Sequence, residues 1–490
     1  MGLSYFSAAK KYPNASQYTT KVISFASGID QSKYSNILST QKAYFSKNFS
    51  FKSGALLGGY GFIYAPFTYA PTEQTEPVCL EEAFSLENAE LFFYKRFDFT
   101  TNQRDDALLI VTQNYDILYL SLQTKQVQVV ASGVFTSMPT GFCYRLNSDD
   151  VFIFSNTTDG MFVLNHTTLE HFVDAPDVTS MCVHYERCFA CSGGEAQRVW
   201  FSEDLDPTNW NVSLDEAGFI DLLDERGRLL KVVSFHDYVY IFREYGISRL
   251  SAIGEQTSFS VTHLYNTSGR IYAKTVAVSG DRILFLAEDG LYSFDGVDTT
   301  CILKELAPLL KVQNNKEPFA IYSCGEYRLF THILHENAVI PCLFCVNPVS
   351  KEYMLTCNVN IHSMASVQTD NLATTMVLCE KEGTVCVMEL NESGSLDGAH
   401  LEKVWQSGFT DFGIPEKVKT LRKITLTTLT DITITLLSET SRVVYTLHGN
   451  ASPQTIVTLF SGKRMSFTIT TTSHQPEISN MQLTLLGLER

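Results

Sequence analysis

The sequence has no apolar run of 18 residues, and no apolar segment follows the basic residues near its start. A bilayer-spanning helix needs about 20 mostly apolar residues, and a secretory signal needs about 7–15. We therefore expect neither a membrane span nor a secretory signal. Runs of lysine and arginine are also missing, and 53 acidic against 37 basic residues give a net charge of −16. This charge argues against a nucleic-acid-binding protein, because phosphate contacts require clustered basic side chains.

The short motifs of several enzyme classes are missing as well. A GxSxG motif, a P-loop and a GxGxxG that follows a strand are absent, and the 11 histidines are dispersed. Two acidic stretches, 202–207 and 215–221, could hold a cation or supply paired carboxylates, but neither has EF-hand spacing. We interpret both as solvated loops. We expect a protein without catalytic residues, cofactors or metals.

Twelve cysteines are scattered along the chain, and four of them form CxxC pairs, Cys188 with Cys191 and Cys342 with Cys345. Zinc ribbons use such pairs, because a tight turn brings both thiolates to one tetrahedral ion. Here the pairs lie in apolar, strand-like segments, where positions i and i+3 face opposite sides of a sheet. We expect buried free thiols, with a zinc or redox site as the alternative.

One strand–turn–strand pattern recurs along the middle of the chain. Each copy is an apolar strand, a short polar turn that usually contains glycine, and a second apolar strand, at 108–120, 151–164, 239–250, 283–294 and 376–388. Strand pairs at a period of about 40–50 residues are typical of a β-propeller, because one four-stranded blade uses that length. The pattern predicts an all-β chain whose residues 86–405 form a propeller of six to eight blades.

The two ends of the chain have a different sequence pattern from the middle. Residues 1–85 are irregular and interrupted by prolines, which predicts an extended arm or isolated strands that must bury their aromatic side chains on another surface. Residues 406–490 alternate threonine with β-branched residues, with turn residues every 8–12 positions. This alternation predicts a small antiparallel β-sandwich. A short helix is expected at 299–312.

Three segments in a fixed order resemble the β-propeller structural proteins of tailed bacteriophages, of the tail nozzle, tail stabilisation and tail-tip types. These are Arg198–Trp210, Leu230–Leu250 and Val278–Gly296. The opening Phe25–Asp30 and the C-terminal Lys417–Leu488 are also similar to the ends of such chains. The resemblance covers most of the chain, but its motifs are patterns and not catalytic signatures.

The resemblance implies a non-enzymatic structural protein of the tail or neck, located in the virion and assembled in the host bacterial cytoplasm. We expect it to form a ring-shaped homo-oligomer and to contact other tail or neck proteins, while genomic DNA only passes through during ejection. An acidic channel wall would let DNA pass without sticking. The arm and one loop are the expected subunit contacts: Phe25, Gly28, Ile29, Asp30, Asp206, Pro207 and Trp210.

Two other functions remain open. A propeller that binds or cleaves host surface glycans would place two carboxylates about 5–10 Å apart in its central channel. A cytosolic interaction scaffold would be monomeric. Abundant aromatics, with 33 phenylalanines and 23 tyrosines, fit sugar stacking or an ordinary core.

Overall fold

The computed structural model describes residues 18–486, except 24, 26–27, 32–41, 52–53, 73–74, 100, 193–196, 215, 255, 268 and 314–315. The chain is all-β, as the sequence predicts. It divides into a large unit, Tyr60–Ala399, and a two-sheet unit that joins Met1–Gly59 to His400–Arg490. None of the helices in the described residues has the length and apolar character needed to cross a membrane.

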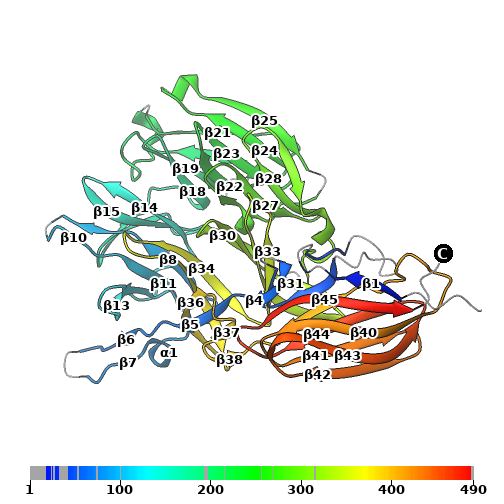
Figure 1. The fold of residues 1–490 in the computed structure, drawn as a ribbon. Helices are drawn as coiled ribbons and strands as arrows, with labels where there is room; N and C mark the ends of the chain where they lie inside the picture. Colours follow the sequence, from blue (N-terminus) through cyan, green and yellow to red (C-terminus); the bar gives the residue numbers. More distant parts are fainter. Residues whose placement is uncertain are drawn as a thin grey trace, which may run out of the picture. The chain divides into compact units, whose positions relative to one another are not determined.

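The large unit contains seven main sheets among the described residues, and five of them are four-stranded antiparallel sheets built from consecutive strands (Figure 1). The first comprises β14 (Thr140–Leu146), β15 (Asp149–Ser155), β16 (Met161–Asn165) and β17 (Thr168–Phe172). The second comprises β18 (Val178–His184), β19 (Arg187–Ser192), β20 (Arg198–Phe201) and β21 (Gly218–Asp221). The third comprises β22 (Leu229–Phe235), β23 (Tyr238–Arg243), β24 (Gly246–Ser251) and β25 (Ser260–Asn266).

The fourth and fifth sheets follow the same plan. The fourth comprises β26 (Ala277–Val278), β27 (Ile283–Ala287), β28 (Gly290–Phe294) and β29 (Thr299–Ile302). The fifth comprises β30 (Phe319–Ser323), β31 (Glu326–His335), β32 (Ala338–Val346) and β33 (Tyr353–Cys357). The helix expected at 299–312 is replaced by strand β29 and a single 3-10 turn at Lys304–Leu306, because the sheet uses the threonine-rich segment as its fourth strand.

Two six-stranded sheets complete the large unit. One has the order β7-β6-β13-β12-β11-β8, and the other β34-β35-β36-β5-β37-β38. The first uses β6 (Thr68–Tyr69), β7 (Val78–Cys79), β8 (Glu90–Tyr94), β11 (Ala107–Val111), β12 (Ile117–Ser121) and β13 (Gln126–Ala131). The second uses β34 (Ile361–Gln368), β35 (Ala373–Lys381), β36 (Thr384–Asn391), β5 (Gly61–Tyr64), β37 (Ser395–Leu396) and β38 (Ala399–His400). Short elements occur in connections between the strands of the large unit: α1 (Leu80–Ala83), β9 (Phe97–Asp98), β10 (Gln103–Arg104) and 3-10 turns at Val212–Leu214, Gln256–Ser258 and Ala273–Thr275.

Strand β5 comes from the start of the unit but pairs antiparallel with β36 near its end. The first and last sheets also meet at their edge strands β8 and β34, where the Leu91 backbone N–H donates to Ser363 Oγ at 3.0 Å. The N-terminal part of the unit is therefore fastened to its C-terminal part by both a strand pair and a side-chain hydrogen bond.

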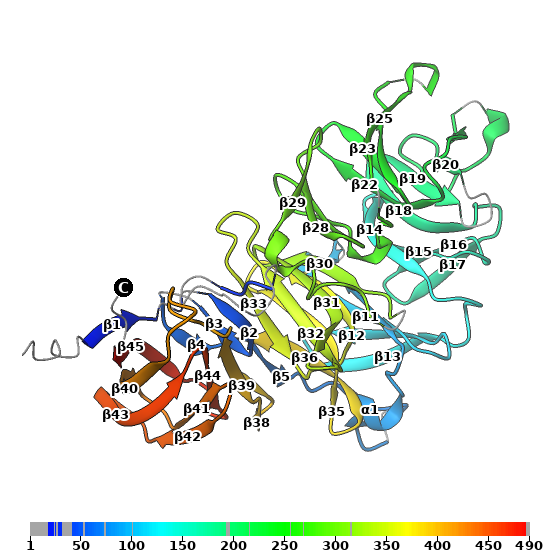
Figure 2. The ribbon, with the colours of Figure 1, turned by 90° about the vertical axis from the view of Figure 1, so that its right-hand side faces the viewer.

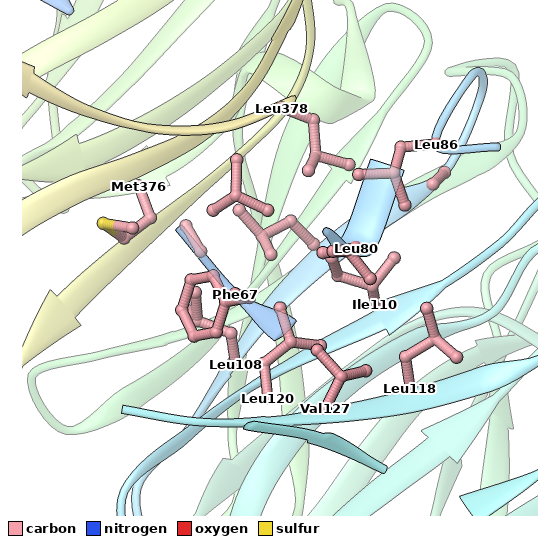
Figure 3. Packing of buried hydrophobic residues seen from close by; sticks show 14 of the residues in the cluster. Phe67, Leu80, Leu86, Leu108, Ile110, Leu118, Leu120, Val127, Met376 and Leu378 are labelled. Carbon is pink, nitrogen blue, oxygen red and sulfur yellow. The ribbon is translucent and has the colours of Figure 1, made fainter. Parts of the chain in front are cut away.

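Successive sheets pack face to face through apolar clusters, and β11 shows how. Leu108 and Ile110 pack with Leu378 of β35 (Figure 3), whereas Leu109 on the opposite face packs with Phe154 of β15. Successive side chains of a strand point to opposite faces, so a strand covered on both sides must be apolar throughout. This packing explains the continuous apolar runs of the hairpin pattern.

The two-sheet unit is built from both ends of the chain (Figure 2). Its larger sheet has the order β3-β4-β45-β40-β43, with β1 also paired to β45, and its smaller sheet has the order β2-β39-β44-β41-β42. The larger sheet uses β1 (Tyr18–Val22), β3 (Phe49–Ser50), β4 (Leu56–Gly58), β40 (Lys419–Thr428), β43 (Asn450–Gly462) and β45 (Glu477–Leu486). The smaller uses β2 (Ala43–Lys47), β39 (Lys403–Ser407), β41 (Ile432–Ser438), β42 (Arg442–Leu447) and β44 (Met465–Thr471).

The domain boundaries differ from those expected at 86 and 406. The described N-terminal residues do not form a separate arm, because β1, β2 and β4 pair with strands of the C-terminal segment and β3 pairs with β4. The sequence predicted that aromatic side chains of this segment are buried on another surface. They are buried within the two-sheet unit, as Phe25, Phe45 and Phe49 show. Burial of those rings accounts for the joining of the two chain ends.

Candidate functional site: the central cavity of the large unit

A cavity of about 1240 Å³ in the large unit is lined by edge strands of several sheets. Its wall takes residues from six different sheets: Glu90, Thr140, Ser180, Lys231, Ile321 and Ser363. The turn Ala273–Thr275 before β26 adds Ala273 and Lys274. Because each of these six sheets contributes an edge strand, side chains far apart in sequence meet in this one space.

The lining of the cavity is charged. Four basic and three acidic side chains contribute to it: Arg228, Lys231, Arg270, Lys274, Glu90, Glu244 and Glu317. The chain as a whole is acidic, with a net charge of −16, so this balance sets the cavity apart from the average surface. The lining belongs to one unit, and the charge on the wall of an assembled ring stays a prediction.

Glu90 joins three elements around the cavity. Its Oε2 accepts a hydrogen bond from Ser363 Oγ of β34 at 3.0 Å, and its Oε1 lies 3.4 Å from Lys274 Nζ. Ser363 Oγ in turn accepts from the Leu91 N–H. The carboxylate is thus held by a hydroxyl on one side and by a half-exposed ammonium on the other.

Lys231 is the unusual group of this wall. It is the one charged residue of the apolar strand β22, and its Nζ donates to the Val276 carbonyl oxygen at 2.8 Å. None of the ion pairs that join described residues involves it, and the neighbouring charge is the Lys274 ammonium. Burial, together with Lys274, lowers the pKa of Lys231 to about 8.

A buried arginine fixes the loop beside Lys231. Arg243 of β23 is fully buried, and its guanidinium donates to Asp224 Oδ1 at 2.5 Å, to the Gly227 carbonyl at 2.9 Å and to the Leu222 carbonyl at 3.2 Å. Burial alone would raise the pKa of Asp224, but hydrogen bonds from the Arg226 N–H and from Arg243 hold it below its ordinary value. This loop leads directly into β22 and so positions Lys231.

His362 also contributes to the lining. Its Nε2 is buried and has no hydrogen-bond partner, and burial lowers the pKa of the ring. A neutral histidine at this position adds no charge to the wall near neutral pH.

A second, smaller pocket of about 800 Å³ lies beside the loop of the second four-stranded sheet that the sequence had singled out. Asp206 and Trp210 line it, together with Trp200, while Pro207 is buried next to them. Asp206 Oδ1 accepts from the N–H and the Oγ1 of Thr208, at 2.9 and 2.6 Å, so its carboxylate organises the loop. Trp210 is 6% exposed and packs in an apolar cluster.

The expected contact residues near the N-terminus are placed inside the two-sheet unit. Phe25 meets Trp405 edge to face with ring centroids 5.1 Å apart. The Ala43 N–H donates to the Gly28 carbonyl at 2.8 Å. The Asp30 N–H donates to the Ala43 carbonyl at 2.9 Å, and the Ile29 side chain is fully buried. These residues take part in packing within their own unit, and their role as subunit contacts stays a prediction.

The four cysteines of the CxxC pairs are buried, which confirms the expected burial of these thiols. Burial raises the pKa of each thiol. Cys342 Sγ lies 3.4 Å from Cys357 Sγ on the neighbouring strand β33. Within the described part of the chain, three or more histidine, cysteine or acidic side chains do not gather in a way that would hold a metal ion.

Sequence reasoning missed Glu90, Lys231 and Lys274. Only Lys231 leaves a signal, as one lysine inside the otherwise apolar strand Leu229–Phe235. The other two come together through the packing of sheets and not through local sequence.

Comparisons with known proteins leave the family open. No family model matches the chain, and no curated protein matches it. Among solved structures, it is similar to PorZ, described as an essential bacterial surface component of the type-IX secretion system of Porphyromonas gingivalis. The match has 11% identity and a TM-score of 0.32, and it covers 70% of this chain and 52% of that one. The chain thus spans about half of PorZ, and a likeness this low supports no conclusion about function.

Proposed function

We propose that the large unit is a seven-bladed β-propeller and that the two-sheet unit is an antiparallel β-sandwich. Seven main sheets support the blade count, and edge strands of six of them line one cavity. Pairing of β5 with β36 would close the ring by placing an early strand in the last blade. Apolar clusters between successive sheets supply the blade-to-blade packing that a propeller requires.

We propose further that the protein is a non-enzymatic structural protein in the tail or neck of a tailed-phage virion, assembled as a ring in the host cytoplasm. The sequence resemblance suggests the virion, and one structural observation supports assembly. Strand β43 ends the larger sheet of the two-sheet unit and pairs only with β40 among the described residues. It is 13 residues long and has no charged residue.

Sheet edges in natural proteins are normally protected by charges, short strands or coverage, because a free edge pairs with other chains. On β43 the side chains of Val457 and Leu459 are 80% and 71% exposed. At the other end of the sheet, β1 exposes Tyr18 and Val22. Pairing of β43 of one copy with β1 of the next would be head-to-tail, and a head-to-tail contact generates a ring when its rotation closes.

The test is the mass of the full-length protein in solution, measured by mass photometry over a range of concentrations. The wild type is expected to form closed oligomers, and V457K/L459K is expected to be monomeric. V349K changes another exposed valine, in the large unit, and is expected to behave as the wild type. A wild type that stays monomeric, or a double variant that assembles normally, would contradict ring assembly through this edge.

A second candidate function is glycan binding by the smaller pocket. Trp200 and Trp210 lie in its wall beside polar side chains that include Asp206 and Asn211. Aromatic faces with a few polar groups are typical of sugar sites. Binding on a glycan array that W200A abolishes, with a chain that remains monomeric, would favour this function over the virion role.

A further inference from the structure

The surroundings of Lys231 do not compensate the positive charge of its ammonium group. Its ammonium donates to one backbone carbonyl, that of Val276. The charge that acts on it from nearby is the ammonium of Lys274, which has the same sign. Lys231 is half-buried, and a charge partly removed from water without a counter-charge is costly, so proteins usually pair such a charge or bind an ion there.

Lys274 completes a pair of ammonium groups at the cavity wall. Its contact with Glu90 is long, at 3.4 Å, and its side chain is 55% exposed. Glu90 already accepts a hydrogen bond from Ser363. The long, exposed side chain of Lys274 can therefore move toward a ligand without leaving Glu90 unpartnered.

A neutral donor lies beside Lys231. Ser180 Oγ accepts a hydrogen bond at 3.2 Å from the N–H of Val232, the residue that follows Lys231 in β22. A hydroxyl that accepts in this way still has its own hydrogen to donate. Two ammonium groups and a hydroxyl are the donors that a compact anion needs.

Two arginines of the lining add positive charge. Arg228 and Arg270 contribute to the same cavity, and none of the ion pairs between described residues uses their guanidinium groups. Glu244 and Glu317 lie in the same lining, which as a whole has four basic and three acidic side chains. In a chain with a net charge of −16, a lining with one more basic than acidic side chain is a favourable place for an anion.

We propose that the central cavity of the large unit is a binding site for a compact anion, a phosphate or carboxylate group, held by Lys231 and Lys274 with Ser180 as a neutral donor. The anion supplies the counter-charge that Lys231 lacks. The proposal does not depend on the virion role, because it rests on the wall of one unit.

The test uses the full-length protein and isothermal titration calorimetry with inorganic phosphate and with citrate, at constant ionic strength. The wild type is expected to bind at least one of them saturably. K231M is expected to weaken binding at least tenfold and K274Q several-fold. K231R, which keeps the charge, is expected to stay within a few-fold of the wild type, and it shows whether loss in K231M reflects charge. K351Q removes an exposed lysine elsewhere in the large unit and should change nothing.

Two results would overturn the proposal. One is the absence of saturable heat from both phosphate and citrate with the wild type. The other is equal affinity in the wild type and K231M, which would place the binding elsewhere on the chain. Binding of phosphate alone would assign a phosphate-bearing ligand, and binding of citrate alone would assign a carboxylate; each supports the site. Neither outcome depends on the oligomeric state, so failure here and failure of the ring are distinguishable.

Discussion

Replacement of Arg243 by methionine is expected to loosen the cavity wall of the large unit. The arginine is fully buried and connects β23 to the loop that precedes β22. Methionine fills a similar volume but cannot donate hydrogen bonds. The carbonyls of Leu222 and Gly227 would then lose a donor, and Asp224 would lose one of its two arginine partners.

The expected size follows from these contacts. Removal of one member of a buried ion pair costs about 3–5 kcal/mol, and each buried acceptor left unpaired costs about 1–3 kcal/mol. Asp224 is 24% exposed and keeps its contact with Arg226 at 3.1 Å, so the lower end applies. We expect a loss of about 3 kcal/mol of local opening free energy, which is roughly a 100-fold change in an opening equilibrium.

Hydrogen-exchange mass spectrometry of peptides covering 222–235 measures this local opening directly. R243M should exchange roughly 100-fold faster in this segment, with little change in the two-sheet unit. R249M is the matched control, because Arg249 lies in the same sheet, covers the Tyr238 ring at 4.3 Å and interacts with the Tyr240 hydroxyl, but forms none of the contacts of Arg243 to the loop. Its loss should be about 0.5–1 kcal/mol. Equal exchange in R243M and R249M would refute the reasoning.

Three further predictions concern the core, the closing strand and the cavity. L108A should lower the stability of the large unit by about 3–5 kcal/mol, because Leu108 is fully buried, and urea denaturation checks this. G61A should release β5 from β36, since a Cβ at Gly61 would overlap the backbone of Ser395. Limited proteolysis should then cut near β5 in G61A but not in the control G280A, where the space around the glycine is open. Anion binding should weaken as pH rises through about 8, the pKa of Lys231, because the neutral amine has no charge to attract the anion. The same affinity for phosphate or citrate at high pH, measured by calorimetry, would contradict this.

The hairpins of the large unit could be predicted because their strands are buried on both faces. Residues 108–120 and 283–294 became β11 with β12 and β27 with β28, each antiparallel around a short turn. A strand covered on both sides leaves a continuous apolar run, and that run is visible in one sequence. The class of fold was therefore accessible from local pattern.

Partners over long distances could not be predicted in the same way. Pairing of β5 with β36, or of β1 with β45, depends on segments more than 300 residues apart, and local alternation does not name the partner. For this reason the local sequence pattern predicted an extended arm for residues 1–85. The candidate site could not be predicted for the same reason. Glu90 and Lys274 come together only through tertiary packing, and no local pattern around either residue indicates their contact.

The most direct test of the account is cryo-electron microscopy of tailed-phage particles from the source of this gene, combined with peptide mass spectrometry of the same particles. The account predicts peptides of this chain in the particles and a symmetric ring in the tail or neck whose subunits fit the seven sheets of the large unit. Particles without this chain, or a chain recovered only from the host fraction bound to glycans, would contradict it.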